Sequence, residues 1–477
     1  MSGELGWLAP LMFGTLFLLL LTGYPVAFVL GAVGLIFGVI GYALGVIPPE
    51  LMQAVPERLF GIMRNDTLLS IPFFTLMGLI LERSGLAEDL LETVGRLFGR
   101  VRGGLAFAVI LVGALLAATT GVVAASVMAM GLISLPIMLR QGYSPAISSG
   151  VIMASGTLAQ IIPPSLVLIV LGDTLSVPVG DMYLGAMIPS LILTAGFAGF
   201  IALMALLKPQ WLPPLEKVEK VTGRQVLSAL VPPLALIFLV LGTIFIGLAT
   251  PTEAGAMGAA GALVLALVKR RLSLDLLRQS LQSTATLTTF VMFILIGSSL
   301  FSLTFRALNG DLWVEHLFDQ LPGGVIGFLL VVNLLIFVLG MFLDFFEIVF
   351  IVVPLLVPVL HKLGIDPVWF GVLIAMNLQT SFLTPPFGFS LFYLRSVAPK
   401  EVTTGHLYRG AVPFIALQLL MVAVLIGWPE LVRHESAEEA AVISAVGDLS
   451  AASGQGASAD EAIRLMQDIA REMRESK

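Results

Sequence analysis

Two proline-centred segments of the chain carry polar groups that could bind a cation. Ser155, Gly156 and Thr157 come shortly before the pair Pro163-Pro164, and Asn377 comes shortly before Thr384-Pro385-Pro386 and Gly388. Proline has no N–H, so carbonyl groups of the preceding helical turn lose their usual donors. Carbonyl, hydroxyl and amide oxygens are the ligands that hard cations prefer. The two segments therefore predict two binding sites for a hard cation such as Na⁺.

The two segments occupy the same register of an internal repeat. Gly142-Tyr-Ser-Pro145 leads into the first and Gly364-Ile-Asp-Pro367 leads into the second, 222 residues later. Each double proline interrupts an apolar stretch, and in a bilayer a broken helix persists only where it lines a protein-enclosed site. Interruptions at corresponding positions of two repeats are typical of a secondary transporter. The alternative, a plain proline kink, applies more readily to one such loop than to two.

Two further apolar stretches contain a central polar break. The breaks are Thr119-Thr120-Gly121 in the first half and Gly340 to Asp344 in the second. We interpret both stretches as re-entrant helical hairpins, whose tips face the proline loops. An acidic group such as Asp344 within a membrane is a candidate functional residue. The alternative is that this hairpin tip lies at the membrane–water interface, where Asp344 is hydrated. For the small residues at the first tip, simple helix packing is the alternative.

Composition predicts an all-α polytopic membrane protein. The chain is 58% hydrophobic and 12% charged, with a mean hydropathy of +1.01. It has no cysteine, and its four histidines are scattered, so neither thiol chemistry nor a histidine metal site is expected. No Walker-type phosphate loop, nucleophile–base constellation or basic nucleic-acid-binding stretch occurs. We therefore expect no enzymatic activity, no cofactor other than a coupling ion, and no nucleic-acid partner.

The expected organisation is an inverted repeat, because five spans in each half make the halves face opposite ways. Lys and Arg in the linker place it on the cytoplasmic side of a bacterial inner membrane. The expected segments, in order, are a first repeat at 1–207, with a hairpin at about 104–139 and a broken helix at about 145–172; a basic linker at 208–224; a second repeat at 225–429, with a hairpin at about 323–361 and a broken helix at about 367–394; and a polar acidic tail at 430–477 with a short amphipathic helix.

Several motifs resemble those of one family. They are Ile71-Pro-Phe-Phe-Thr-Leu-Met-Gly78, Gly131-Leu-Ile-Ser-Leu-Pro-Ile-Met138, Ala154-Ser-Gly-Thr-Leu-Ala-Gln-Ile-Ile-Pro-Pro-Ser165, Gly364-Ile-Asp-Pro-Val-Trp-Phe-Gly371 and Thr384-Pro-Pro-Phe-Gly388. In order and spacing they resemble the large membrane subunit of tripartite ATP-independent periplasmic (TRAP) transporters, within the ion transporter superfamily. The resemblance covers residues 5–429.

The resemblance implies a mechanism, partners and a ligand set. It implies an elevator, in which a transport domain of hairpins and broken helices slides against a scaffold, driven by Na⁺. It implies a small four-helix membrane subunit and a periplasmic binding protein that delivers an organic acid, with the substrate bound between the hairpin tips and the Pro-Pro loops. Carried over residue by residue, sodium site one comprises Thr119, Thr120, Gly121, Ser155, Gly156, Thr157 and Pro163, and sodium site two comprises Gly340, Asp344, Asn377, Thr384, Pro385 and Gly388.

Two departures from the family pattern stand out. The first hairpin tip reads Thr120-Gly-Val-Val123, where many members have Ser-Gly-Ser-Ser, so site one would have fewer hydroxyl ligands. The tail after the last span has no family role. The tip is similar to that of members handling small organic acids, including 2-oxo acids. Alternative functions are a stand-alone anion transporter of the same superfamily without a binding protein, a channel, and a membrane-embedded enzyme.

Overall fold

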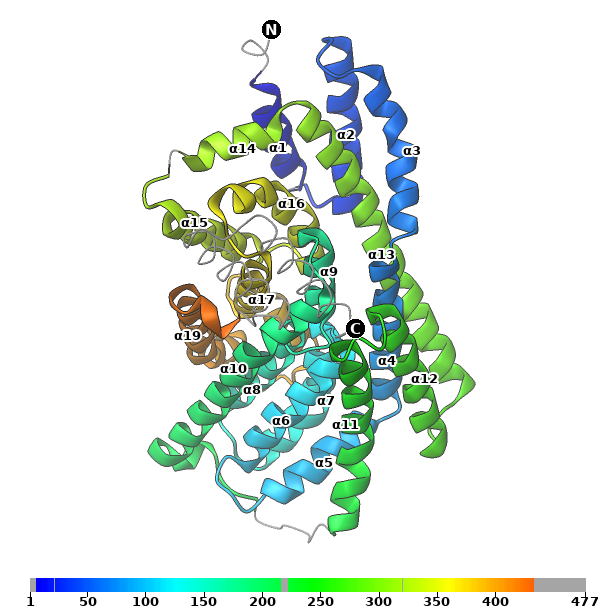
Figure 1. The fold of residues 1–477 in the computed structure, drawn as a ribbon. Helices are drawn as coiled ribbons and strands as arrows, with labels where there is room; N and C mark the ends of the chain where they lie inside the picture. Colours follow the sequence, from blue (N-terminus) through cyan, green and yellow to red (C-terminus); the bar gives the residue numbers. More distant parts are fainter. Residues whose placement is uncertain (1–5, 21, 216–221, 320, 433–477) are drawn as a thin grey trace, which may run out of the picture. The chain divides into compact units, whose positions relative to one another are not determined.

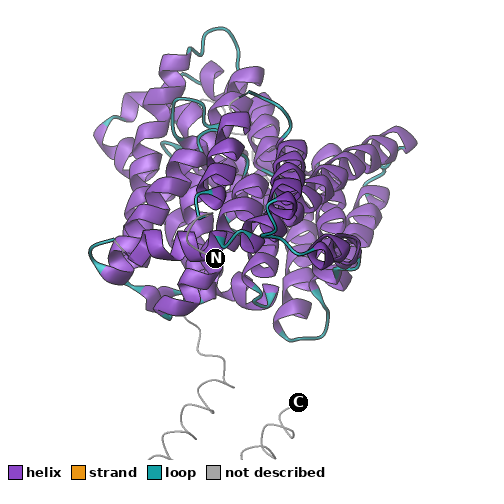
Figure 2. Ribbon diagram, turned by 90° about the horizontal axis from the view of Figure 1, so that it is seen from above, coloured by secondary structure: helices purple, strands orange, loops and turns teal. Residues whose placement is uncertain are grey.

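A computed structural model describes residues 6–20, 22–215, 222–319 and 321–432, which fold into helices joined by short loops, without a strand among the described residues (Figure 2). The predicted tail helix lies outside the described residues. Residues up to Val432 form one compact unit. The helices of its first half are α1 (Leu8–Leu20), α2 (Val26–Ala43), α3 (Pro49–Met63), α4 (Asp66–Arg83), α5 (Leu86–Phe98), α6 (Gly104–Thr120), α7 (Val123–Arg140), α8 (Pro145–Thr157), the 3₁₀ turn η1 (Leu158–Gln160), α9 (Leu166–Leu175), α10 (Val179–Leu207) and the turn η2 (Pro209–Trp211).

The second half repeats this order of elements. Its helices are α11 (Gly223–Phe245), α12 (Pro251–Val268), α13 (Leu274–Ala307), α14 (Gly310–Asp319), α15 (Gly324–Leu339), α16 (Phe345–Leu363), α17 (Pro367–Leu383), α18 (Phe389–Val397), α19 (Thr404–Gly427) and the turn η3 (Pro429–Leu431). Both halves contain a hairpin, α6–α7 or α15–α16, followed by a broken helix, α8–α9 or α17–α18. The predicted fold class, with two re-entrant hairpins and two broken helices, is confirmed.

Large apolar side chains on the outer faces of the helices indicate a lipid-facing surface. Within the described residues, eight helices are long and apolar enough to cross a membrane. Leu206 is 80% exposed, Phe238 71% and Leu248 74%. In water each such side chain would cost roughly 25 cal/mol per Å² of exposed apolar surface, a cost that lipid removes. The chain is a multi-pass membrane protein.

One set of helices is held together by close backbone contacts. α2 packs along α13, and α4 packs along α12 (Figure 1). A Cβ on Gly34 of α2 would lie 2.8 Å from the carbonyl carbon of Leu300 of α13, and Thr304 Oγ1 donates a hydrogen bond to the Gly34 carbonyl at 2.9 Å. Small residues that let helices approach closely stabilise helix pairs in lipid, where hydrophobic burial gives no advantage.

A second set contains the hairpins and broken helices. α8 packs against α6, α7 and α19, while α17 packs against α9, α15 and α19. The closest approach in this set is between Gly150 of α8 and Gly410 of α19, where a Cβ on Gly150 would lie 2.7 Å from the carbonyl carbon of Gly410. Glycine is required at both positions because any side chain would overlap the facing backbone.

The two halves differ at one point that sequence reasoning did not resolve. In the second half the residues that correspond to α3 and α4 form the single continuous helix α13. In the first half the break between α3 and α4 has a local cause, because Asn65 accepts hydrogen bonds from the backbone N–H groups of Thr67 and Leu68 and so starts α4. The residue 222 positions later is Leu287, whose side chain cannot cap a helix, and α13 continues through it.

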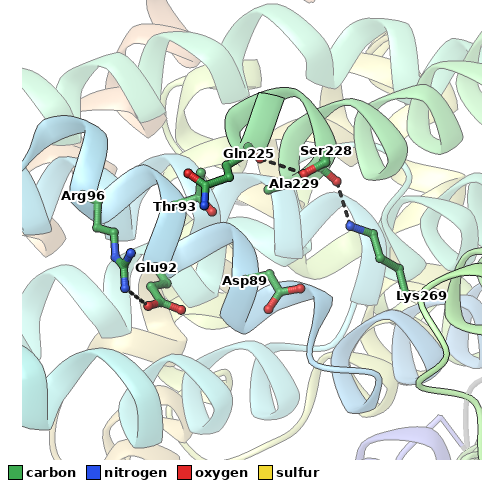
Figure 3. A pocket seen from close by; sticks show the side chains of 8 residues that line it. All are labelled: Asp89, Glu92, Thr93, Arg96, Gln225, Ser228, Ala229 and Lys269. Atoms are coloured by element: carbon green, nitrogen blue, oxygen red, sulfur yellow. Dashed lines mark hydrogen bonds and ion pairs between the residues drawn. The ribbon is translucent and has the colours of Figure 1, made fainter. Parts of the chain in front are cut away.

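Two short helices, α5 and α14, connect the two sets and were not predicted from the sequence. α5 packs against α11, and Asp89 of α5 pairs with Arg271 in the turn after α12. Figure 3 shows side chains of α5 and α11 that line one pocket together with Lys269. Arg271 Nη2 lies 2.8 Å from Asp89 Oδ1, and Lys269 Nζ donates to the carbonyl of Ser228 at 3.0 Å. Under the positive-inside rule, the basic residues at this end of the molecule predict that it faces the cytoplasm.

Candidate functional site

The tip of the first hairpin lies against the first broken helix. Gly121 ends α6 with φ +59°, and a Cβ there would lie 3.0 Å from Leu166 Cγ and 3.3 Å from the Leu166 backbone nitrogen. Leu166 is the first residue of α9, directly after the Pro-Pro loop. Thr119 and Thr120 end α6, and the structure does not describe their side chains. The first hairpin tip and the first proline loop are therefore neighbours in the fold.

The other residues of predicted site one lie in the break of α8–α9. Ser155 is fully buried, and its Oγ has no hydrogen-bond partner within the described part of the chain. A Cβ on Gly156 would lie 3.2 Å from the Val127 backbone nitrogen, so α8 touches the second turn of α7 here. Thr157 Oγ1 donates to the Ala154 carbonyl at 2.8 Å and accepts from Gln418 Nε2 at 3.2 Å. Pro163 precedes Pro164 through a cis peptide bond in the loop between η1 and α9.

The second hairpin meets the second broken helix in the corresponding way. Gly340 follows the last residue of α15, and a Cβ there would lie 2.9 Å from Ser381 Cβ on α17. Asn377 Nδ2 donates to the Asn333 backbone carbonyl at 2.7 Å and to Asn333 Oδ1 at 3.0 Å, which joins α17 to α15. The amide nitrogen of Asn377 is thus engaged, and its oxygen is the atom suited to a cation.

Asp344 is the N-cap of α16. Its carboxylate accepts a hydrogen bond from the Phe345 N–H at 2.8 Å, while Glu347 Oε2 accepts from the Asp344 N–H at 3.1 Å. This capping box explains why α16 begins here and gives Glu347 a role of its own. The cap uses only part of the acceptor capacity of a carboxylate, which has about four lone-pair sites.

The second proline loop directs carbonyl groups toward one glycine. Gly388 has φ +51°, and a Cβ there would lie 2.8 Å from the Thr384 carbonyl oxygen and 3.1 Å from the Phe382 carbonyl oxygen. Thr384 Oγ1 donates to the Thr380 carbonyl at 2.8 Å, and Pro385 precedes Pro386 through a cis peptide bond. Glycine at this position leaves two backbone oxygens accessible at the end of α17.

Several buried polar side chains of this region lie outside the two predicted sodium sites. Gln160 and Gln379 are fully buried, and neither amide has a hydrogen-bond partner among the residues described. An unpaired buried polar group costs roughly 1–3 kcal/mol, so such groups are expected to meet a ligand, an ion or water. Asn333 orients Asn377, and Gln418 orients Thr157. The available signal was the presence of amide side chains within largely apolar helices, which carries no information about their distant partners.

The chain is similar to known proteins along most of its length. The profile of the family described as "Tripartite ATP-independent periplasmic transporter, DctM component" matches residues 13–431. The chain belongs to this family. It is similar to the C4-dicarboxylate TRAP transporter large permease protein DctM of Pseudomonas aeruginosa, with 30% identity over 382 residues that cover 79% of this chain and 88% of that one. The resemblance noted in the sequence is confirmed.

Two further similarities bear on partners and on fold. The isethionate TRAP transporter permease protein DctMQ of Oleidesulfovibrio alaskensis is 28% identical over 421 residues, which cover 87% of this chain and 64% of that longer protein. The crystal structure of the Alcanivorax borkumensis YdaH transporter, described as having an unusual topology, aligns with a TM-score of 0.57 and 16% identity over 80% of this chain and 88% of that one. The second similarity shows a shared fold. The permeases of this family are transporters, not enzymes, as expected.

The residues present suit Na⁺ at both places. Site one offers the unpartnered Ser155 hydroxyl beside the loop of Pro163, and site two offers the Asp344 carboxylate, the Asn377 amide oxygen and the carbonyls around Gly388. All are hard oxygen donors on elements that pack together. No cluster of three or more histidine, cysteine or acidic side chains suited to a transition metal occurs among the described residues.

Proposed function

We propose that this chain is the large permease of a Na⁺-coupled TRAP transporter in a bacterial inner membrane, which takes up a small organic acid. The observation that carries the proposal is the matched packing of the two hairpin tips against the two broken helices, with oxygen-rich groups at both contacts. A periplasmic binding protein would deliver the acid, and a small four-helix membrane subunit would complete the complex. The longer DctMQ relative supports a close association between the permease and a second membrane component.

The movement we propose is an elevator. The set containing the hairpins, α8–α9 and α17–α18 would move as the transport domain, and the set of α2, α4, α12 and α13 would act as the scaffold. One polar contact between the two sets is a hydrogen bond that Asn65 Nδ2, at the start of α4, donates to Asp173 Oδ1 of α9 at 2.7 Å. Na⁺ bound at both hairpin tips would stabilise the closed hairpins around the acid. The Na⁺ gradient would thereby drive uptake of the acid.

Uptake by the reconstituted complex is expected to require Na⁺ and not ATP. The oxygen ligands at both hairpin tips favour a hard monovalent cation, and no phosphate-binding loop occurs in the sequence. Proteoliposomes containing both membrane subunits, given the binding protein and labelled succinate, pyruvate or isethionate, measure this directly. Equal uptake from a proton gradient in Na⁺-free buffer would contradict the coupling. Equal uptake without the binding protein would favour the stand-alone alternative.

A disulfide between the two sets is expected to stop transport reversibly. The chain has no native cysteine, so Asn65→Cys with Asp173→Cys introduces the only pair. Oxidation should arrest uptake and reduction should restore it, because α9 could no longer move past the start of α4. Asp66→Cys with Thr252→Cys is the matched control, since the Thr252 hydroxyl bonds to the Asp66 carbonyl within the scaffold. Full uptake by the oxidised Asn65–Asp173 pair would rule out the sliding movement.

A further inference from the structure

An open cavity of about 610 Å³ lies beside α4 and α13, and none of the predicted sodium ligands lines it. Its lining residues are Arg83, Gln279, Gln282, Ser283, Thr286, Leu287 and Phe290. Of these described side chains, only Arg83 is charged. Its Nη2 donates to Ser283 Oγ at 2.8 Å, which fixes the guanidinium against α13 and uses one of its five N–H donors.

The spacing of the lining residues shows which way this cavity runs. Positions 279, 282, 283, 286 and 290 recur at three or four residues and therefore share one face of α13. At the upper end of this face Phe290 contacts Phe346 of α16, with ring centroids 6.3 Å apart. Phe346 is two residues beyond Asp344, so the polar face leads from the second hairpin tip toward the end of α4.

The end of the cavity beside Arg83 opens to the end of the molecule that we predict faces the cytoplasm. Arg83 is in the last turn of α4, and the next residue, Ser84, accepts a hydrogen bond from Arg271 Nη1 at 3.1 Å. α13 has 34 residues and is about 51 Å long, well beyond the roughly 30 Å hydrocarbon core. Its first turns therefore project into water, and their exposed glutamine and threonine side chains make the cavity walls wettable.

We infer that this cavity is a cytoplasmic release vestibule, in which Arg83 binds the carboxylate of the departing acid. The inference rests on the proposed function. A planar guanidinium held by Ser283 presents parallel N–H groups that match a carboxylate, and the neighbouring Gln282 amide supplies further donors. Solvent weakens the contact, so the anion is retained briefly and then released.

Counterflow by the complete complex tests this inference. Binding protein added outside the proteoliposomes selects molecules whose periplasmic face is outward, so the acid trapped inside meets the cytoplasmic face. Arg83→Gln should raise the internal concentration of acid needed for half-maximal exchange roughly threefold to tenfold. Its dependence on external Na⁺ and binding protein should stay unchanged, and Arg83→Lys should show a smaller effect. Arg278→Gln is the matched control, because Arg278 lies on α13 but does not line the cavity.

A second measurement covers the case in which Arg83→Gln does not assemble. Thr286→Cys creates a single thiol in the cavity wall, and the trapped acid should slow its alkylation by an impermeant maleimide from the cytoplasmic side. The vestibule is overturned if Arg83→Gln and the wild type need the same internal concentration of acid for half-maximal exchange, or if the acid does not slow alkylation of Thr286→Cys. In either case, uptake by the wild type still supports the proposed function. Absence of uptake of succinate, pyruvate and isethionate by the wild type overturns both.

Discussion

Replacing Asp344 with Asn is expected to raise the Na⁺ concentration for half-maximal uptake by about tenfold or more, without unfolding α16. Asn caps a helix about as well as Asp, so the hydrogen bond to the Phe345 N–H can persist. What is lost is one negative charge beside the second proline loop. Hydrogen bonds and ion contacts of charged groups contribute roughly 1.5–3 kcal/mol, about tenfold to a hundredfold in affinity. Na⁺ titration of uptake in proteoliposomes measures this shift.

The chain offers a matched control for this substitution. Asp366 is the N-cap of α17, where its carboxylate accepts from the Val368 N–H at 2.9 Å, and it lies outside both predicted sodium sites. Asp366→Asn removes the same charge from the same kind of cap and should leave the Na⁺ dependence unchanged. If both variants titrate like the wild type, Asp344 serves only as a helix cap.

Replacing Gly410 with Ala is expected to destabilise the folded protein by about 3 kcal/mol, the upper part of the range for overpacking. The added Cβ would overlap the Ala146 carbonyl oxygen and would lie 2.9 Å from the Gly150 nitrogen, and neither backbone atom can move independently of α8. Because α8 carries Ser155 and Thr157, a displaced α8 would also disturb the first proline loop. The midpoint of heat-induced aggregation in detergent should fall, and Na⁺-dependent uptake should fall with it.

Gly199→Ala is the control for this loss. Gly199 lies within α10, and a Cβ there meets nothing within 4 Å. Alanine has the higher helix propensity, so this variant should be at least as stable as the wild type. An equal midpoint for Gly410→Ala and Gly199→Ala would mean that α8 and α19 separate without cost.

The sequence by itself determined the class of protein and the two pairs of interrupted elements. Apolar spans and double prolines act locally: lipid requires a continuous helix, and proline breaks one wherever it falls. The breaks at Pro163 and Pro385 and the hairpin tips at Gly121 and Gly340 could therefore be predicted without tertiary information. The sequence did not predict that Asp344 caps α16, because an acidic residue at a break fits both a helix cap and an ion ligand.

Only the tertiary structure decided which distant groups meet. Gln418 bonds Thr157 across 261 positions, and Arg83 meets Ser283 across 200, contacts that no local spacing encodes. α13 likewise continues through Leu287 because Leu287 cannot cap a new helix and because α13 packs along α2. Such contacts depend on where whole helices are placed, and helix placement in lipid follows from close glycine contacts such as Gly150 with Gly410, whose partners lie in the other half of the chain.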